Sequence, residues 1–300
     1  MGLCPGAAVE DDTVPNSKRR ARLLDMRRLF PVTDQTDETS VRPDETSVRA
    51  DEASVRADEA SVREWELGEL ADAYAYPPGD APWLRANMVS TLDGAAQHDG
   101  RSHPISNATD MRIFGTLRSV ADAVVVGAET VRQEGYRPAR AREAFAERRA
   151  AAGQTVVPAI AVVSASLNLD FTLPLFTSPL VPTLVVTGAQ APADRVAAAE
   201  KAGAVVVVAG EGAVVEPERV APALAERGLT RLLTEGGPRL LGQFVAAGAL
   251  DELCLTVSPM LTAGDAQRIA WGSALAVPER FALASVLEEA GFLFTRYRRT

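Results

Sequence analysis

One strand–turn–helix pattern near the C-terminal end restricts the possible folds of this chain more than any other segment. The apolar run Leu229–Leu233 is followed closely by Glu235, two adjacent glycines and Pro238, and an amphipathic stretch, Leu240–Ala247, comes next. The pattern predicts a strand, a tight turn and a helix. Glycines let a ligand approach the backbone, and the first N–H groups of a helix lack intrahelical acceptors. Such a turn suits a phosphate group. An ordinary strand-to-helix connection, with glycines that allow close packing, accounts for the same sequence equally well.

A second turn of this kind lies upstream. The apolar strand Ala123–Val126 runs into Gly127, which opens a short helix containing Thr130. Two strand–glycine–helix turns, each able to hold a phosphate group, are the arrangement expected around a dinucleotide. No G-x-G-x-x-G sequence opens a helix in the chain, which argues against an ordinary Rossmann domain.

The segment before this turn predicts a strand and a helix. Arg85–Gly94 reads as a strand that ends in an Asp-Gly turn. Ser106 is placed to cap a helix that ends near Arg118, with Asp110 in its first turn. The apolar face of this helix is expected to carry four residues at helical spacing: Met111, Phe114, Leu117 and Val120.

Three motifs in this order resemble the pyrimidine reductase family of riboflavin biosynthesis. They are N-x-x-x-x-L-D-G from Asn87, L-R-x-x-x-D-A-x-x-V-G-A-x-T-V from Leu117 and T-E-G-G-P-x-L from Thr234. The resemblance covers about residue 83 to the C-terminus and is to the stand-alone actinobacterial type. It implies a dihydrofolate reductase-like α/β fold, with a mixed, mostly parallel sheet flanked by helices. It also implies a homodimer that uses NADPH to reduce 5-amino-6-(5-phosphoribosylamino)uracil to the ribitylamino compound, by hydride transfer to the ring-opened ribose C1′.

The resemblance also implies roles for individual residues. Asn87 and Glu235 match positions that imply catalytic residues, which bind the ribose hydroxyls or the amine and steady the ring-opened imine that accepts the hydride. Ser102 and Arg118 match substrate-binding positions, with Arg118 on the 5′-phosphate. A further arginine is expected on that phosphate, Arg140 or Arg137, because residues 135–140 replace the D-P-x-L-T loop of the family. The expected NADPH contacts are Ser90, Gly127, Thr130, Glu134, Ser164, Gly236, Gly237, Pro238 and Leu240, with Ser166 beside Ser164 near the 2′-phosphate.

Two other functions compete with this one. A dihydrofolate or pterin reductase on the same fold would need a buried carboxylate to hold the pteridine, and Asp110 is the one candidate in the expected helix. A non-catalytic nucleotide-binding protein would bind NADPH without turnover. The sequence shows no spacing of metal ligands and no nucleophilic triad, and its two histidines, His98 and His103, are expected in loops.

Composition narrows the class of protein. The 300 residues are 47% hydrophobic with a net charge of −9, which argues against nucleic-acid binding. No apolar run reaches the length of a membrane span. Two cysteines, Cys4 and Cys254, cannot form a disulfide framework, and Cys254 is expected in the core. These features predict a soluble protein of the reducing cytoplasm, and the family resemblance implies a small-molecule substrate for it.

The N-terminal quarter contains four near-identical heptads at residues 37–64. A coiled coil needs two apolar seam positions in each heptad, and only the valines recur reliably. With nine acids and four arginines, the segment is predicted to be a disordered, solvated spacer. The expected organisation is a disordered or misannotated leader (1–25), a leader segment (26–36), the repeats, a short amphipathic helix with a linker (65–82), and the reductase domain (83–300).

The remainder alternates strands and helices. A charged, solvated helix is expected over Arg140–Ala152. Further strands are expected at Ala159–Val163, Thr183–Thr187, Ala204–Val208 and Arg231–Thr234, helices at Ala191–Ala202 and Glu216–Arg227, and two antiparallel strands at Glu252–Val257 and Phe292–Tyr297.

Overall fold

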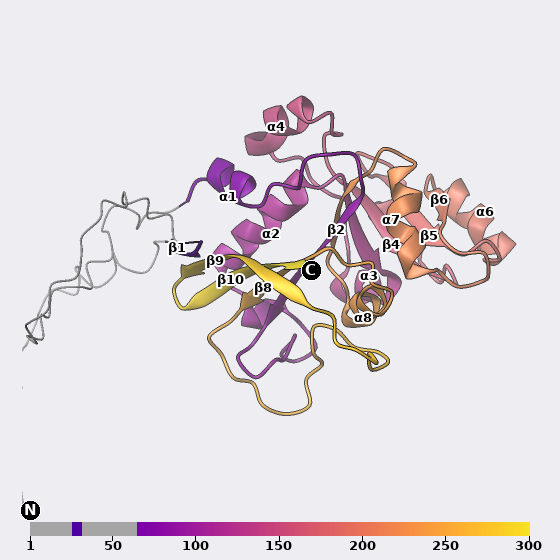
Figure 1. Cartoon of the computed structure of the whole chain (residues 1–300). Helices are drawn as coiled ribbons and strands as arrows, with labels where there is room; N and C mark the ends of the chain where they lie inside the picture. The colour runs from indigo at the N-terminus through magenta and orange to yellow at the C-terminus, as the bar shows by residue number, and fades with distance from the viewer. Residues whose placement is uncertain (1–25, 32–64) are drawn as a thin grey trace, which may run out of the picture.

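A single mixed sheet organises the computed structural model, which describes residues 26–31 and 65–300 (Figure 1). The strands of this sheet are β1 (Arg27–Phe30), β2 (Trp83–Ser90), β3 (Ala123–Gly127), β4 (Ala159–Val163), β5 (Leu184–Thr187), β6 (Val205–Val208), β7 (Arg231–Thr234), β8 (Glu252–Val257), β9 (Phe281–Glu289) and β10 (Phe292–Arg299). The α-helices are α1 (Leu67–Ala73), α2 (Ala108–Val120), α3 (Ala128–Glu134), α4 (Ala146–Ala151), α5 (Pro174–Thr177), α6 (Ala193–Lys201), α7 (Pro217–Ala225) and α8 (Pro238–Ala246). Two short 3-10 helices are η3 (His103–Ile105) and η4 (Glu143–Phe145).

The strand order is β1-β9-β10-β8-β2-β7-β3-β4-β5-β6. The strands from β8 to β6 pair in parallel, and β10, β9 and β1 extend the sheet with antiparallel pairs. Because β7 lies between β2 and β3, the carboxyl ends of these three strands meet at one edge of the sheet. The turns that follow β3 and β7 are therefore neighbours in space, although about 100 residues separate them in the sequence.

Each strand of the central sheet sends alternate side chains to opposite faces, as the two-residue period requires. In β3, Val124 and Val126 pack with Ile113 and Leu117 of α2. The alternating Val125 packs in the core of the other face, which is built with α7 and α8. Helices thus cover both faces, as the near-continuous apolar sequence of parallel strands predicts.

The expected mostly parallel sheet flanked by helices is confirmed, and the expected strands before Glu252 are present with small shifts of their ends. The strand at the sequence Glu252–Val257 was expected as an antiparallel addition, and this is only half right. It pairs in parallel with β2 on one side and antiparallel with β10 on the other. Strands β1 and β9, which the apolar pattern did not reveal, complete the antiparallel edge.

The helix expected to end near Arg118 begins one residue later than the sequence suggested. Asn107, rather than Ser106, caps α2, because its side chain accepts the N–H of Asp110 at 2.8 Å. Ser106 instead donates its hydroxyl to the Asp110 carboxylate at 2.5 Å. The predicted apolar face is also rotated in part, since Met111 is 47% exposed and Ile113 takes its place in the core.

The prediction of a solvated helix over Arg140–Ala152 is wrong in two respects. Only Ala146–Ala151 is α-helical, so the first part of this segment is a loop followed by η4. Arg149 is buried, and its guanidinium donates to the carbonyls of Ser119, Ala121 and Thr155. Arg149 therefore stabilises the core, because its guanidinium satisfies carbonyl groups at the C-terminal end of α2.

The repeats at residues 37–64 and the leader at 1–25 lie outside the described residues. Residues on either side of the repeats do belong to the fold. Met26 is fully buried in the main core, and β1 pairs with β9. Arg28 stacks on Trp65, with its guanidinium carbon 5.0 Å from the ring centroid, so the two flanks of the repeats lie together.

Candidate functional site

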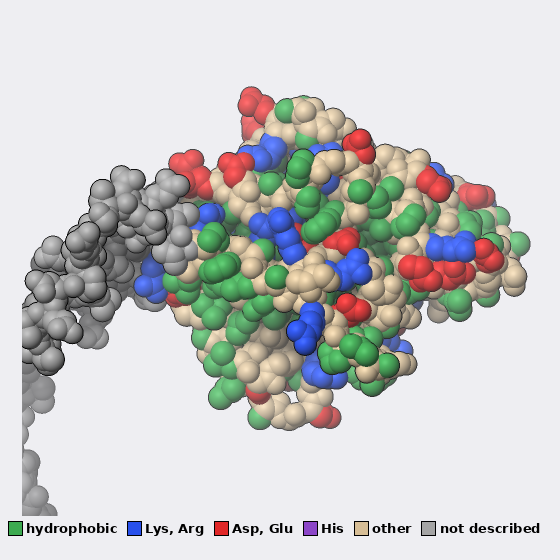
Figure 2. Space-filling model, in the orientation of Figure 1, with side chains coloured by type: hydrophobic (Ala, Val, Ile, Leu, Met, Phe, Trp, Pro, Cys, Tyr) green, Lys and Arg blue, Asp and Glu red, His purple; other side chains and the backbone are tan. Residues whose placement is uncertain are grey.

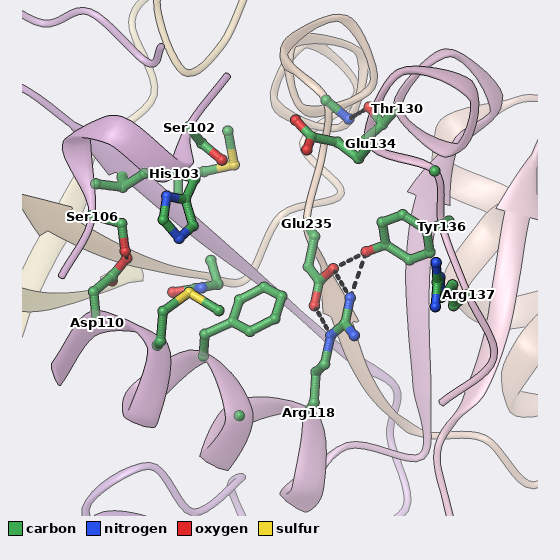
Figure 3. Close-up of a pocket in the computed structure, with 18 of the residues that line it drawn as sticks. Ser102, His103, Ser106, Asp110, Arg118, Thr130, Glu134, Tyr136, Arg137 and Glu235 are labelled. Carbon is green, nitrogen blue, oxygen red and sulfur yellow. Dashed lines mark hydrogen bonds and ion pairs between the residues drawn. The ribbon is translucent and has the colours of Figure 1, made fainter. Parts of the chain in front are cut away.

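A cavity of about 840 Å³ lies at the carboxyl ends of β2, β7 and β3 (Figure 3). Its walls come from β2, α2, α3, the loop 135–142 and the turn before α8. In parallel α/β sheets, ligands bind beyond the carboxyl ends of the strands, so the position of this cavity is that of a ligand site.

The two glycine turns predicted from the sequence are hydrogen-bonded to each other at the cavity. The N–H of Gly127 donates to the carbonyl of Gly236 at 2.8 Å. The N–H of Gly237 donates to the hydroxyl of Thr130, also at 2.8 Å (Figure 3). Each turn therefore holds the backbone of the other, and Gly237 and Pro238 bring the start of α8 to the cavity wall.

This junction has no space for a side chain at Gly237. A Cβ there would lie 2.7 Å from the Thr130 hydroxyl, which is closer than such contacts allow. Gly236 has a φ of +78°, a backbone conformation that favours glycine. Gly236 is thus required by backbone geometry, and Gly237 is required by close packing.

In the middle of the cavity, Arg118 and Glu235 form a bidentate ion pair (Figure 3). The Nε and Nη2 atoms of Arg118 lie 2.5 and 2.6 Å from the two carboxylate oxygens. The Tyr136 hydroxyl accepts from Arg118 at 2.8 Å and donates to Glu235. Burial works to lower the pKa of Arg118, but the Glu235 carboxylate outweighs it and the pKa is raised. Arg118 is therefore a permanent cation in this site.

The loop 135–142 forms a cationic wall. Arg137, Arg140 and Arg142 all line the cavity. Arg142 lies against Gly115 of α2, where an added Cβ would fall 2.0 Å from its Nη1 atom. Gly115 and Arg118 are three residues apart and so lie on neighbouring positions of the helix surface. The loop consequently places a second guanidinium on the same helix as Arg118.

The other end of the cavity is lined by Asn87, Ser102, His103 and Asp110. Burial raises the pKa of the Asp110 carboxyl, and hydroxyl donors from Ser106 and Thr256 partly offset that rise. The Thr256 hydroxyl lies 2.6 Å from one carboxylate oxygen, and the Ser106 hydroxyl lies 2.5 Å from the other. Both oxygens of Asp110 therefore already accept hydrogen bonds from this chain.

The cavity brings together ten of the residues predicted for the reductase site: Asn87, Ser102, Arg118, Thr130, Glu134, Arg137, Arg140, Glu235, Gly237 and Pro238. Six other predicted cofactor residues do not line it: Ser90, Gly127, Ser164, Ser166, Gly236 and Leu240. Ser90 and Ser164 are buried, Ser166 is exposed, and Gly127, Gly236 and Leu240 build the junction behind the wall. Contact of these six with a cofactor stays a prediction.

Sequence reasoning missed two polar lining residues of the loop wall, Tyr136 and Arg142, and assigned the lining residue Phe114 only to an apolar helix face. Tyr136 lies within residues 135–140, where the chain departs from the family motif, and Arg142 follows them, so the motif gave no signal for either. The spacing of Arg137, Arg140 and Arg142 in one short loop was the available sign of a cationic wall.

Among the residues that the structure describes, no group of three or more His, Cys, Asp or Glu side chains is arranged to hold a metal ion. In the same part of the chain, no helix combines the length and apolar character needed to cross a bilayer.

Comparison with known proteins gives a consistent result. The RibD C-terminal domain family matches residues 82–287. A 2,5-diamino-6-ribosylamino-4(3H)-pyrimidinone 5′-phosphate reductase from Methanothermobacter thermautotrophicus is 30% identical over 195 residues, covering 65% of this chain and 86% of the relative. The reductase of the same name from Archaeoglobus fulgidus is 28% identical over 184 residues, covering 61% of this chain and 83% of the relative.

Solved structures resemble the chain over a similar extent. A pyrimidine reductase-like protein from Corynebacterium diphtheriae superimposes with a TM-score of 0.67 at 30% identity, covering 77% of this chain and 98% of that one. The riboflavin biosynthesis reductase Rib7 of Saccharomyces cerevisiae shares the fold, with a TM-score of 0.57 at 12% identity, covering 78% and 99% of the two chains. The expected dihydrofolate reductase-like fold is confirmed by these neighbours.

Proposed function

Because this chain belongs to the RibD C-terminal domain family, we propose that it is an NADPH-dependent reductase of a ribosylaminopyrimidine phosphate. The proposed substrate is 5-amino-6-(5-phosphoribosylamino)uracil, which is reduced to the ribitylamino compound. The observation that carries the proposal is that one cavity joins a glycine junction at a helix N-terminus to a wall of arginines. The first suits a dinucleotide and the second a phosphorylated substrate.

The residues at the glycine junction fit a dinucleotide. Gly237 and Pro238 stand at the cavity wall, and the N–H groups of Arg239 and Leu240, in the first turn of α8, lie too early in the helix for intrahelical acceptors. Glycine at 237 leaves room for the Thr130 hydroxyl against the turn, and this contact keeps the start of α8 at the cavity wall. We assign the cofactor to this junction, with Thr130 and Glu134 beside it.

NADPH, when bound, supplies the hydride that the reaction needs. The chain has to bind the two ligands, orient them and exclude water, because positioning accounts for most of the rate enhancement in such a transfer. Glu235 lies between the glycine junction and Arg118, and Asn87 lines the same cavity from β2. We assign these two side chains to the ribose of the substrate.

The substrate phosphate is assigned to the arginines. Arg118 is shared with Glu235, so this pair contributes little net positive charge. Arg140 and Arg142 in the loop wall add two more cations at the same cavity. We therefore propose that the phosphate lies between Arg118 and the loop, with Ser102 contacting the substrate from the opposite side.

A pterin or dihydrofolate reductase remains the alternative function. It would use Asp110 to grip the pteridine edge. Both carboxylate oxygens of Asp110 already accept hydroxyl hydrogen bonds, so a pteridine would have to share them with or take them from Ser106 and Thr256. This arrangement favours the aminopyrimidine as substrate.

The deciding experiment follows NADPH oxidation with four compounds assayed side by side. They are the aminouracil phosphate, the diaminopyrimidinone phosphate for which the relatives are named, the dephosphorylated aminouracil, and dihydrofolate. We expect turnover with a phosphorylated compound, a KM for the dephosphorylated form at least about tenfold higher, and no turnover with dihydrofolate. Turnover with dihydrofolate alone would overturn the proposal, and NADPH binding without turnover of any compound would favour the non-catalytic function.

The homodimer and the cytoplasmic location implied by the family also belong to this proposal. Nucleic acid has no place in it, since acidic and apolar side chains interrupt the basic ones on the face shown in Figure 2.

A further inference from the structure

Tyr136 connects the loop wall to the ion pair in the middle of the cavity. It is the second residue of the loop 135–142, and its ring packs against the main hydrophobic core. Its hydroxyl accepts a hydrogen bond from Arg118 and donates one to Glu235 (Figure 3). Three side chains from three separate segments, α2, the turn after β7 and the loop, therefore share one network.

The charges of Arg118 and Glu235 set the direction of the hydrogen bonds in this network. Glu235 is an acceptor only and Arg118 is a donor only, whereas a phenol can accept from one and donate to the other. The Arg118 guanidinium carbon also lies 5.3 Å from the Tyr136 ring centroid and 4.4 Å from that of Phe114. Tyrosine thus complements both charges of the pair at once, and phenylalanine would keep only the ring contacts.

The far end of the loop is held in a different way. Arg142 packs over Gly115 of α2, and its guanidinium carbon is 5.4 Å from the ring centroid of Phe145. Arg137 and Arg140 lie between these two anchors and have exposed side chains. The hydrogen bonds of Tyr136 therefore fix the other end of the loop, next to α3, to the Arg118–Glu235 pair.

We propose that Tyr136 is a positioning residue whose hydroxyl tethers the arginine loop to the Arg118–Glu235 pair, so that loop and pair bind the substrate phosphate as one preorganised surface. The identity of the anion rests on the proposed function. The tether does not depend on that function, because it is formed by side chains of the protein alone. Preorganisation of this kind acts on binding, because the free protein already holds the cations in place.

The test compares Tyr136→Phe with the matched control Tyr76→Phe. Tyr76 is also partly buried, and its hydroxyl donates to the carbonyl of Leu232 at 3.0 Å, so Tyr76→Phe also removes one hydroxyl donor. Tyr76 does not line the cavity. For Tyr136→Phe we expect the KM of the phosphorylated substrate to rise by about tenfold, the usual size for a lost hydrogen bond to a charged group. We expect kcat and the KM for NADPH to stay within about twofold, and Tyr76→Phe to leave all three unchanged.

A second measurement needs no substrate. Trypsin is applied to each native protein, and mass spectrometry follows cleavage after Arg140 and Arg142, since Pro138 protects the bond after Arg137. We expect Tyr136→Phe to be cut at these two sites several times faster than the wild type or Tyr76→Phe, because local opening exposes the loop.

The outcomes separate the tether from the function. Unchanged cleavage in Tyr136→Phe would overturn the tether, whatever the kinetics. Faster cleavage with an unchanged substrate KM would overturn the positioning role. If the wild type turned over no phosphorylated substrate, the proposed function would fail, and the cleavage rates would still decide whether Tyr136 holds the loop.

Discussion

At the scale of single residues, the turn after β7 gives opposite tasks to neighbouring positions. Glu235 points into the cavity and pairs with Arg118, whereas Gly237 contacts Thr130 and opens the backbone at the start of α8. A carboxylate at the edge of an anion-binding turn would repel a phosphate if nothing neutralised it. Arg118 provides that neutralisation, so the acid and the turn that we propose for the cofactor phosphate can stand two residues apart.

Gly237→Ala tests the close packing at this turn. The added Cβ would lie 2.7 Å from the Thr130 hydroxyl, so either Thr130 or the turn has to shift. We expect the Kd for NADPH to rise by about tenfold or more, measured by titration of NADPH fluorescence. The control is Gly68→Ala in α1, where an added Cβ meets no atom within 4 Å. Wild-type affinity in Gly237→Ala would refute our placement of the cofactor.

The sequence revealed these residues because their chemistry is local. A glycine pair between a strand and a helix, followed by proline, has few structural meanings, and the family motif added Arg118 and Asn87. Tyr136 and Arg142 were not predicted, because their roles depend on partners far away in the sequence. Likewise, the motif suggested that Arg118 binds phosphate, and no local signal showed that Glu235 would occupy two of its nitrogens.

At the scale of elements, α2 is the helix that carries the site. Its buried face holds Ile113 and Leu117 in the core, while Phe114, Gly115 and Arg118 line the cavity. The apolar periodicity located this helix but placed Met111 on the buried face, because periodicity cannot separate a core-facing side chain from one that faces an apolar cavity. β9 was missed for a different reason, because most of its residues are exposed or partly buried and one of its two buried side chains is the acidic Glu289.

Gly115→Ala tests the contact between α2 and the loop. Alanine is the better helix former by about 0.5–1 kcal/mol, so we expect Tm to hold or to rise by about 1–3 °C. The new Cβ would nevertheless lie 2.0 Å from Nη1 of Arg142, the far end of a flexible side chain, which has to move. We therefore expect a several-fold higher KM for the phosphorylated substrate and an unchanged KM for NADPH.

Gly68→Ala is the control for this variant too, since it should raise helix stability without any change in either KM. A fall in Tm for Gly115→Ala would show that the backbone of α2, rather than Arg142, gives way. An unchanged substrate KM would show that Arg142 takes no part in binding.

At the scale of the whole molecule, residues 26–31, which precede the repeats in the sequence, are built into the sheet. Met26 is fully buried, Arg27 forms an ion pair with Glu288 at 2.6 Å, and β1 extends the antiparallel edge. The boundary of the predicted reductase domain at residue 83 therefore marks where the family motifs begin. Parts of the leader segment and the helix α1 belong to the same core.

This arrangement predicts different results for two deletions. Removal of residues 37–63 leaves residues 32–36 and 64 to join the flanks, a linker that spans up to roughly 20 Å. The contact between Arg28 and Trp65 brings the flanks close enough for such a linker. We expect kcat, both KM values and Tm to match those of the full chain.

Removal of residues 1–64 should behave otherwise, because it takes away β1 and the buried Met26 and exposes the edge of β9. The lost Met side chain alone should destabilise the fold by about 2–5 kcal/mol, which would appear as a Tm lower by several degrees. Thermal unfolding and NADPH oxidation of the two deletion variants decide the matter together. Lost activity on removal of residues 37–63 would contradict the role of the repeats as a spacer, whereas a normal Tm without residues 1–64 would contradict the structural role of β1.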